Sequence, residues 1–165
     1  ILKSSIDTAA VFHDADTIVA TKSEIDALSS SELSTAARSY LDINCAHCHR
    51  SELTLTEPLY EGPAGDSGLR LEFNRIFDPL STDFGICKTA LAGGGGVGHD
   101  EHPLDIVPGH SEVSYLPYRM SSLEGSHKMP ELGRSTVHHE GVYLISKWID
   151  DMAENTCGLT LPLVP

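Results

Sequence analysis

A chain of 165 residues with 40% apolar and 21% charged side chains can bury one domain-sized core, which excludes a disordered tail and a fibrous repeat. Its 11 Lys and Arg against 24 Asp and Glu give a net charge of −13 with neutral His. A chain this acidic repels nucleic-acid phosphates and anionic lipid surfaces, so its charge favours a basic partner or a neutral ligand. No apolar run approaches the ~20 residues that a membrane-spanning helix needs.

Three parts are predicted along the chain. Residues 1–30 mix short apolar runs with Ser, Thr and Asp, and we expect an N-terminal arm that lies over the core, with a helical turn in it. Residues 31–157 are predicted to form one domain, and residues 158–165 an extended tail or linker remnant. The chain opens Ile1-Leu2-Lys3 without a signal pattern, so we expect it to be excised from a larger multi-domain protein whose targeting segment lies elsewhere.

One helix is predicted near each end of this domain. The first should begin at the Ser29–Glu32 capping box and end at Cys45, because its apolar residues recur at steps of three and four. These residues are Leu33, Ala36, Ala37, Tyr40 and Leu41. The second helix should carry one apolar stripe formed by Val137, Gly141, Leu144, Ile145, Trp148, Ile149 and Met152.

Residues 51–114, between these helices, are predicted to be rich in loops. They hold five prolines and most of the 14 glycines, including the run Gly93–Gly96. A phosphate-binding loop would need Lys and then Ser or Thr after its last glycine, whereas Gly98 is followed by His99 and Asp100. We therefore expect a plain loop here and no nucleotide site.

The pattern that carries chemistry is Cys45-Ala46-His47-Cys48-His49, a C-x-x-C-H motif typical of c-type haem attachment. Two thiols three positions apart can each form a thioether with one vinyl group of the same porphyrin, and His49 can then ligate the iron. A zinc site would need further paired ligands. A thioredoxin-type redox pair would open a helix, whereas this motif follows one. The motif therefore predicts one covalently bound haem c.

The second axial ligand of the iron is predicted to be Met129. It lies in a short polar loop before the last helix, and Pro130 stiffens that loop. His127 is the main rival, because two histidines are a common ligand pair in c-type centres. Met120 is a further alternative, while Met152 belongs to the apolar stripe of the last helix and is expected in the core.

With these residues the chain resembles the class I monohaem cytochromes c. The resemblance covers about residues 31–152 and is carried by Ser39–Arg50, Ile106–Gly109 and Met129–Arg134. It implies a mainly α cytochrome c fold, in which N- and C-terminal helices pack around one haem c. A departure is the long loop-rich insertion, since 80 positions separate His49 from Met129.

The same stretches look like the cytochrome c domains of secreted multi-domain bacterial proteins. Some of those domains accompany carbohydrate-binding modules and are thought to pass electrons to lytic polysaccharide mono-oxygenases. The resemblance therefore implies a periplasmic or extracellular location and a copper-dependent polysaccharide oxidase as electron acceptor.

Several other residues are expected to support the haem. Cys87 and Cys157 are predicted to form a disulfide, because haem c is attached outside the cytoplasm, where disulfides form readily. The carbonyl of Pro63 is a candidate, by analogy with other cytochromes c, to accept the ring hydrogen of His49. Four cations are left open as partners of the haem propionates: Arg70, Arg119, Lys128 and Arg134.

The function that these predictions favour is electron transfer by one haem with His49 and Met129 as iron ligands, in a carrier that is not itself an enzyme. The acidic charge favours a redox partner with a basic patch. The alternative is a haem peroxidase or a gas-sensing haem domain in which the sixth ligand can be displaced.

Overall fold

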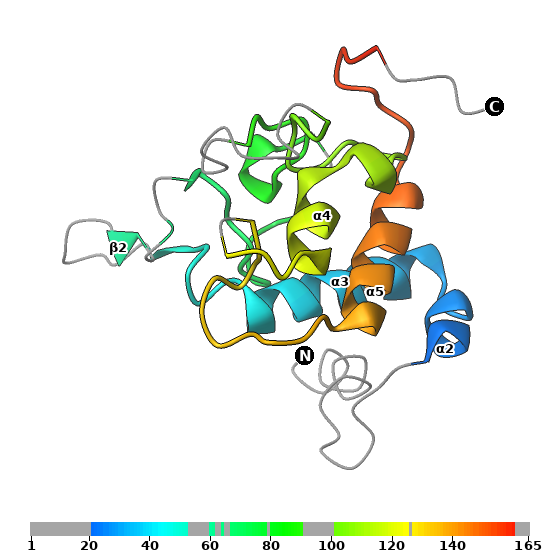
Figure 1. Cartoon of the computed structure of the whole chain (residues 1–165). Coiled ribbons are helices and arrows are strands. Elements are labelled where there is room, and N and C mark those ends of the chain that lie inside the picture. The colour runs from blue at the N-terminus through cyan, green and yellow to red at the C-terminus, as the bar shows by residue number, and fades with distance from the viewer. Residues whose placement is uncertain are drawn as a thin grey trace.

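The computed structural model describes residues 21–52, 60–61, 64, 67–78, 80–90, 101–125 and 127–160. The described chain is mainly helical, as predicted, with one short pair of antiparallel strands (Figure 1). The α-helices are α2 (Lys22–Asp26), α3 (Ser30–Asn44), α4 (Tyr115–Ser121) and α5 (His139–Asp150). The strands are β1 (Ser51–Glu52) and β2 (Tyr60–Glu61), and the 3₁₀ turns are η2 (Thr82–Phe84) and η3 (Ser111–Val113).

Helix α3 confirms the prediction for the first helix. The Glu32 carboxylate reaches back to accept the backbone N–H of Ser29 at 2.9 Å, which completes the expected capping box. The five apolar residues of its predicted stripe are all buried, and the helix ends at Asn44 with Cys45 as its C-cap. The C-x-x-C-H motif therefore begins where the helical hydrogen bonding of α3 stops.

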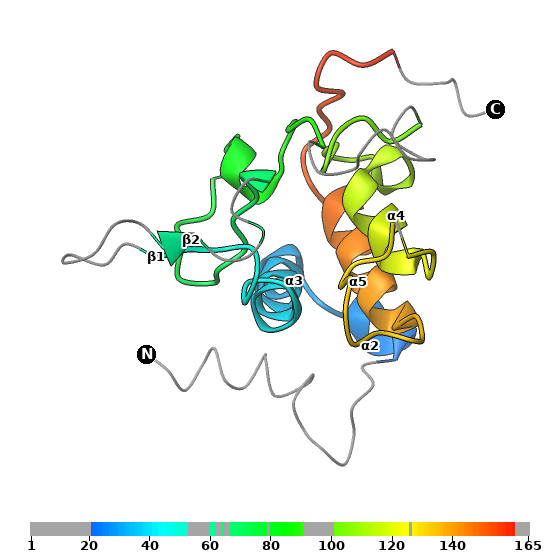
Figure 2. The same cartoon turned by 60° about the vertical axis from the view of Figure 1, so that its left-hand side comes forward.

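Helices α3 and α5 cross closely where Tyr40 meets Gly141. A Cβ atom at Gly141 would collide with the hydroxyl and ring of Tyr40 and would lie 2.8 Å from Nδ1 of His138. The Tyr40 hydroxyl shares a hydrogen bond of 3.0 Å with that same nitrogen. In Figure 2, α3 is seen nearly along its axis, with α4 and α5 on one side and the strands on the other. Absence of a side chain at position 141 thus permits this crossing.

The apolar stripe of α5 faces the core as predicted. Leu144, Ile145, Trp148 and Ile149 are buried, whereas Met152 lies beyond the helix end and packs against the core from its edge. Asp150 stands at the negative end of the helix dipole, where a carboxylate is unfavourable. It instead accepts the backbone N–H of Ser111 at 2.8 Å and the Ser111 hydroxyl at 3.0 Å, which caps η3.

Part of the predicted arm belongs to the packed fold. Helix α2 buries Ile25 completely in the main core. Asp26 accepts a hydrogen bond from the Tyr143 hydroxyl at 2.7 Å and pairs with Lys147 at 3.1 Å, both on α5. Residues 1–20 lie outside the described residues, so the rest of the arm stays a prediction.

The loop-rich segment supplies much of the core despite its few regular elements. Ile86 and Ile106 form an isolated parallel bridge and are both buried. Lys88 pairs with the partly buried Asp105 at 3.0 Å, beside this bridge. The predicted Cys87–Cys157 disulfide is present and ties the segment to the chain beyond α5. The glycine run 93–96 lies outside the described residues.

Helix α4 was not predicted from the sequence, and it contains Pro117. Pro117 is the third residue of the helix, where its missing N–H would have no intrahelical acceptor in any case. Met120 on α4 is buried and belongs to the core cluster with Leu116. A proline that argues against a helix interior is therefore compatible with this first turn.

We predict that Gly141→Ala destabilises the protein by about 1–3 kcal/mol, because the added methyl overpacks the α3–α5 crossing. The gain in helix propensity from Gly to Ala, at most about 1 kcal/mol, should not offset this cost. Urea unfolding followed by circular dichroism measures the change. Gly125→Ala is the control, since a Cβ there meets nothing within 4 Å, and it should change stability by less than about 0.5 kcal/mol. Equal effects of the two substitutions would contradict the close crossing.

Candidate functional site

The C-x-x-C-H motif forms a tight turn directly after α3. The backbone N–H groups of Cys48 and His49 both donate to the Cys45 carbonyl, at 3.0 and 2.9 Å. Leu71 N–H in turn donates to the His49 carbonyl at 2.8 Å, which joins the turn to the loop-rich segment. The motif is therefore held by backbone hydrogen bonds on both sides.

A cavity of about 290 Å³ adjoins this turn. Its walls come from the end of α3, from α4, from the start of α5 and from the loop between α4 and α5, which Figure 1 shows running past the ends of these helices. Cys45 of the motif and Met129, the predicted second ligand, both line it. The lining residues are Tyr40, Asn44, Cys45, Met120, Met129, Pro130, Leu132, Gly133, Arg134, Thr136, His138 and Val142.

The thiol of Cys45 differs from that of a thioredoxin-type redox pair. It lies at the C-terminal end of α3, where the helix dipole disfavours a thiolate. Burial, with a smaller contribution from Cys48, raises the pKa of the Cys45 thiol to about 12. Free Cys45 would therefore be a neutral thiol at physiological pH, which disagrees with a nucleophilic redox cysteine.

His49 is buried and held in one orientation. Its Nδ1 lies 3.2 Å from the Ser67 hydroxyl, which itself donates to the Ala64 carbonyl at 2.7 Å. Because the Ser67 proton is used in that bond, the hydroxyl accepts from an Nδ1–H of His49. This tautomer leaves the lone pair on Nε2, the atom that would bind a metal. Pro63, the residue expected in this supporting role, lies outside the described residues.

The imidazole of His49 is also kept uncharged. Burial, together with the nearby positive charges of Arg119 and Arg70, lowers its pKa to about 4, although a hydrogen bond with the Leu69 backbone acts in the opposite direction. A neutral imidazole is the form that ligates a metal. The surroundings of His49 therefore suit an iron ligand.

The candidates for the second iron ligand lie in different places. Met129 is half-buried and Met120 buried, and both line the cavity. His127 is also buried, but it is not among the lining residues and its ring stands edge-on to Tyr118 at 6.1 Å. Met152 packs elsewhere against the core. The cavity wall therefore contains two thioethers and not the His127 imidazole. Cys48 and His49 of the motif are not among its lining residues either, and they adjoin it through Cys45.

Of the four cations expected near haem propionates, Arg134 lines the cavity itself. Arg70 and Arg119 are buried and close enough to lower the pKa of His49. The Lys128 ammonium approaches the Arg134 carbonyl at 3.4 Å. The Nε of Arg134 is buried without an acceptor among the described residues.

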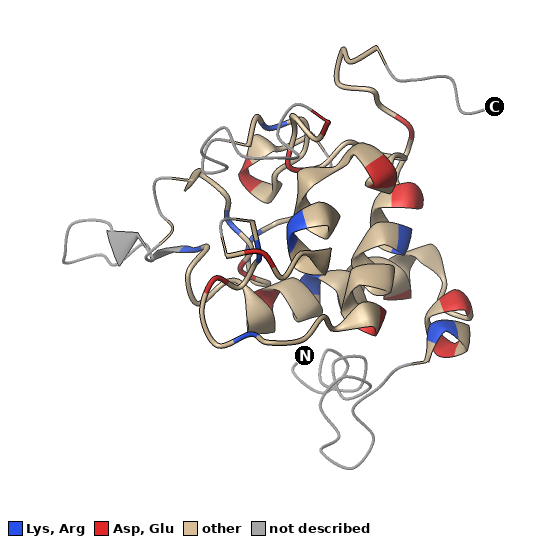
Figure 3. Cartoon of the chain, in the orientation of Figure 1, with Lys and Arg blue, Asp and Glu red and all other residues tan. Residues whose placement is uncertain are grey.

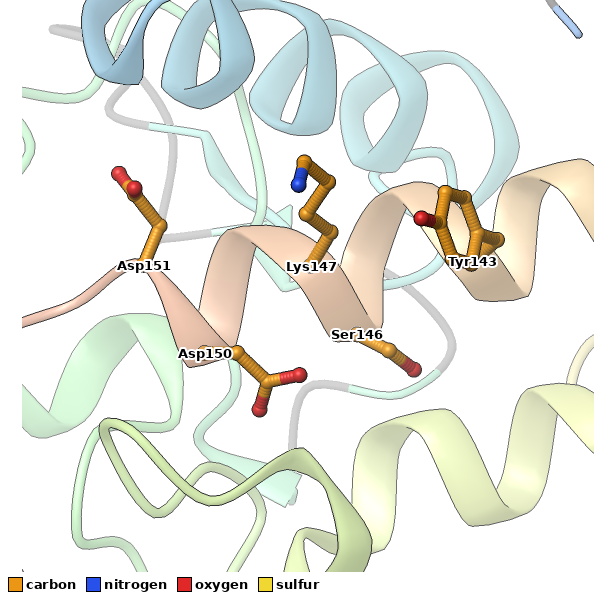
Figure 4. A pocket seen from close by; sticks show the side chains of 5 residues that line it. All are labelled: Tyr143, Ser146, Lys147, Asp150 and Asp151. Carbon is orange, nitrogen blue, oxygen red and sulfur yellow. The ribbon is translucent and has the colours of Figure 1, made fainter. Parts of the chain in front are cut away.

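Other places in the described chain offer no comparable site. A hollow of about 320 Å³ on α5 is lined by Tyr143, Ser146, Lys147, Asp150 and Asp151, spread along one side of the helix (Figure 4). Tyr143 and Lys147 already bind Asp26 of α2. Within the described ranges no group of three or more His, Cys, Asp or Glu side chains could hold a metal ion, and no helix is long and apolar enough to cross a membrane. Since Cys87 and Cys157 are paired with each other, neither can complete a zinc site with the motif.

Comparisons with known proteins add no relative. The chain matches no protein-family model, no curated protein and no solved structure.

Two residues of the site were missed by sequence reasoning. Tyr40 was expected only in the core, yet it also lines the cavity and bonds His138. Ser67, whose hydroxyl accepts the hydrogen bond from His49, lies 18 positions after His49 in the chain. It belongs to a loop with no helical or strand periodicity. No sequence pattern pointed to Ser67, because only the path of that loop brings it beside the imidazole.

Proposed function

We propose that this protein is an electron carrier with one haem c bound covalently through Cys45 and Cys48, with His49 and Met129 as iron ligands. One observation carries the proposal. Cys45 of the attachment motif and Met129, 84 positions apart in the chain, line the same cavity. A covalent haem held at Cys45 would therefore have a thioether within the same space.

Several features of the cavity fit a haem. Apolar side chains of Met120, Val142 and Leu132 contribute to its walls and would contact the porphyrin. His49 has the neutral form and the tautomer of an iron ligand. The unpartnered Nε–H of Arg134 offers a donor to a propionate. The crossing of α3 and α5 beside the cavity agrees with the finer fold assignment, a cytochrome c fold.

When bound, a haem supplies an iron that accepts and releases one electron at a time. The chain would contribute the rest. Ser67 keeps the proton on Nδ1 of His49, and the surrounding burial and arginine charges keep that ring neutral. A thioether ligand is soft and favours the reduced iron, so it raises the potential above that of a two-histidine centre. With His49 and Met129 both bound to the iron, no open position would remain for a substrate.

The disulfide supports a location outside the cytoplasm, where haem c is attached and such bonds persist. The resemblance to domains of secreted bacterial proteins adds a periplasmic or extracellular location and a copper-dependent polysaccharide oxidase as acceptor. The net charge of −13 supports a partner with a basic patch. Acidic residues stand out on α2 and towards the end of α5 (Figure 3).

The covalent haem is tested directly on the protein. We expect intact-mass measurement of material made with a haem c maturation system to show one added haem, and acid-acetone extraction to leave the colour with the protein. The Cys45→Ala, Cys48→Ala double variant should lose the attached haem. The Cys87→Ala, Cys157→Ala double variant is the matched control, because it also removes two cysteines, but these form the disulfide and lie outside the C-x-x-C-H motif. Free haem released from the unmodified protein would refute the proposal.

Replacement of Met129 by Ala should abolish the weak red-end absorption band that marks a thioether on ferric iron, lower the reduction potential, and open the iron to added imidazole. Met120→Ala removes a thioether that lines the same cavity and should keep the band. If Met120→Ala abolishes the band while Met129→Ala retains it, the ligand is the other sulfur.

Electron exchange with a basic redox protein should slow as salt rises. Charges interact over ~30 Å at 0.01 M ionic strength but only ~10 Å at 0.1 M, so screening removes the attraction that brings the partners together. Stopped-flow reoxidation of the reduced protein across a salt series measures this. A small uncharged oxidant is the control, and its rate of electron exchange should depend little on salt concentration. A rate with the basic partner that does not change with salt would contradict the charge argument.

A further inference from the structure

The loop that carries Met129 joins α4 to α5 and has little regular hydrogen bonding of its own. Several of its backbone carbonyls are instead bonded to arginine side chains. Arg134 donates from one terminal nitrogen to the Met129 carbonyl and from the other to the Ser122 carbonyl. A single guanidinium therefore bridges the start of the loop and Met129.

Arg119 of α4 holds the same loop from its other side. Its Nε donates to the His127 carbonyl at 2.9 Å, and its own carbonyl accepts the Met129 N–H at 3.0 Å. Both backbone polar groups of Met129 are thus engaged, one with Arg134 and one with Arg119. This fixes the main chain from which the thioether projects.

Arg134 retains one donor that the loop does not use. Its Nε is buried and has no acceptor in the described part of the chain, although Arg134 lines the cavity. Leaving a buried charged donor unsatisfied is costly, so a small shift of the side chain that brings Nε to an acceptor on the occupant of the cavity would relieve that cost. An arginine with a free N–H suits a carboxylate above all other groups.

We propose that Arg134 is a positioning residue that ties the Met129 loop to a carboxylate of the cavity's occupant, a haem propionate. This inference rests on the proposed function and assigns one cation among the four that the sequence left open. The two terminal nitrogens hold the loop at Ser122 and Met129, while Nε donates to the propionate. Binding of the haem and placement of its second ligand are therefore coupled through one side chain.

The coupling has a measurable consequence. An added ligand such as imidazole reaches the iron only when Met129 has moved away, so its apparent affinity scales with the fraction of molecules in which the loop is open. Loss of a hydrogen bond to a charged donor changes such an equilibrium by about tenfold or more.

The loop contact is tested with Arg134→Lys, which keeps the positive charge but cannot bridge two carbonyls and a carboxylate at once. We expect imidazole to bind the ferric protein at least about tenfold more tightly, and the thioether band to weaken. Arg134→Gln serves as a second variant if Arg134→Lys does not mature. Arg75→Lys is the matched control, because Arg75 pairs with Glu72 and Asp83 at 2.9 Å within the loop-rich segment. Unchanged imidazole affinity in Arg134→Lys would overturn the proposal.

The contact between Arg134 and the propionate is tested in a variant that lacks the Met129 thioether. In a Met129→Ala background, adding Arg134→Met should lower the reduction potential further, because a cation bonded to the propionate is lost. Adding Arg75→Met to the same background measures the effect of losing a positive charge that is not among the residues lining the cavity, and it should be smaller. Equal potentials with and without Arg134 would overturn the propionate contact.

Measurements on the unsubstituted protein distinguish a failure of the proposed function from a failure of the role assigned to Arg134. If it carries no covalent haem or no thioether band, the proposed function itself fails. If it has both and the Arg134 variants behave like their Arg75 controls, only the role of Arg134 is wrong.

Discussion

The close crossing of α3 and α5 is the contact on which the rest of the described structure depends. Gly141 leaves room for the Tyr40 ring, whose hydroxyl then meets His138 at the start of α5. Tyr40 precedes Cys45 by little more than one helical turn, so the crossing also sets where the attachment motif leaves α3. A side chain at position 141 would push the helices apart and shift the motif relative to the wall that α5 provides.

The cavity beside this crossing brings together chemistry from distant parts of the chain. Its thiol comes from the end of α3, its two thioethers from α4 and the following loop, and its guanidinium from the approach to α5. His49 lies in the same turn as Cys45, with its ring oriented by Ser67 from the loop-rich segment. Each contribution is modest alone. Their convergence supports our proposal of an electron-transfer haem over a zinc site or a dithiol redox pair.

The loop-rich segment contributes to the core and supports His49, although it has few regular elements. Leu71, Phe84, Ile86 and Ile106 are almost completely buried, and the Leu71 N–H bonds the carbonyl of His49. The disulfide joins this segment to the chain after α5. The segment is thus anchored at the motif and at the far end of the last helix, which explains how so irregular a stretch can orient His49.

The sequence by itself determined the two long helices, their buried faces, the capping box at Ser29, the disulfide and the attachment motif. These depend on local periodicity, on short spacings or on the pairing of two remaining cysteines, all of which can be read along the chain. Only the tertiary structure decided that Met129 and Cys45 share a cavity, that Ser67 orients His49, and that Arg134 bonds the Met129 carbonyl. Helix α4 was likewise missed, because a proline is tolerated in a first turn that the sequence did not reveal. These contacts join residues whose separation in the chain follows no period, so they arise from the packing of α3 against α5 and from the paths that loops take around it.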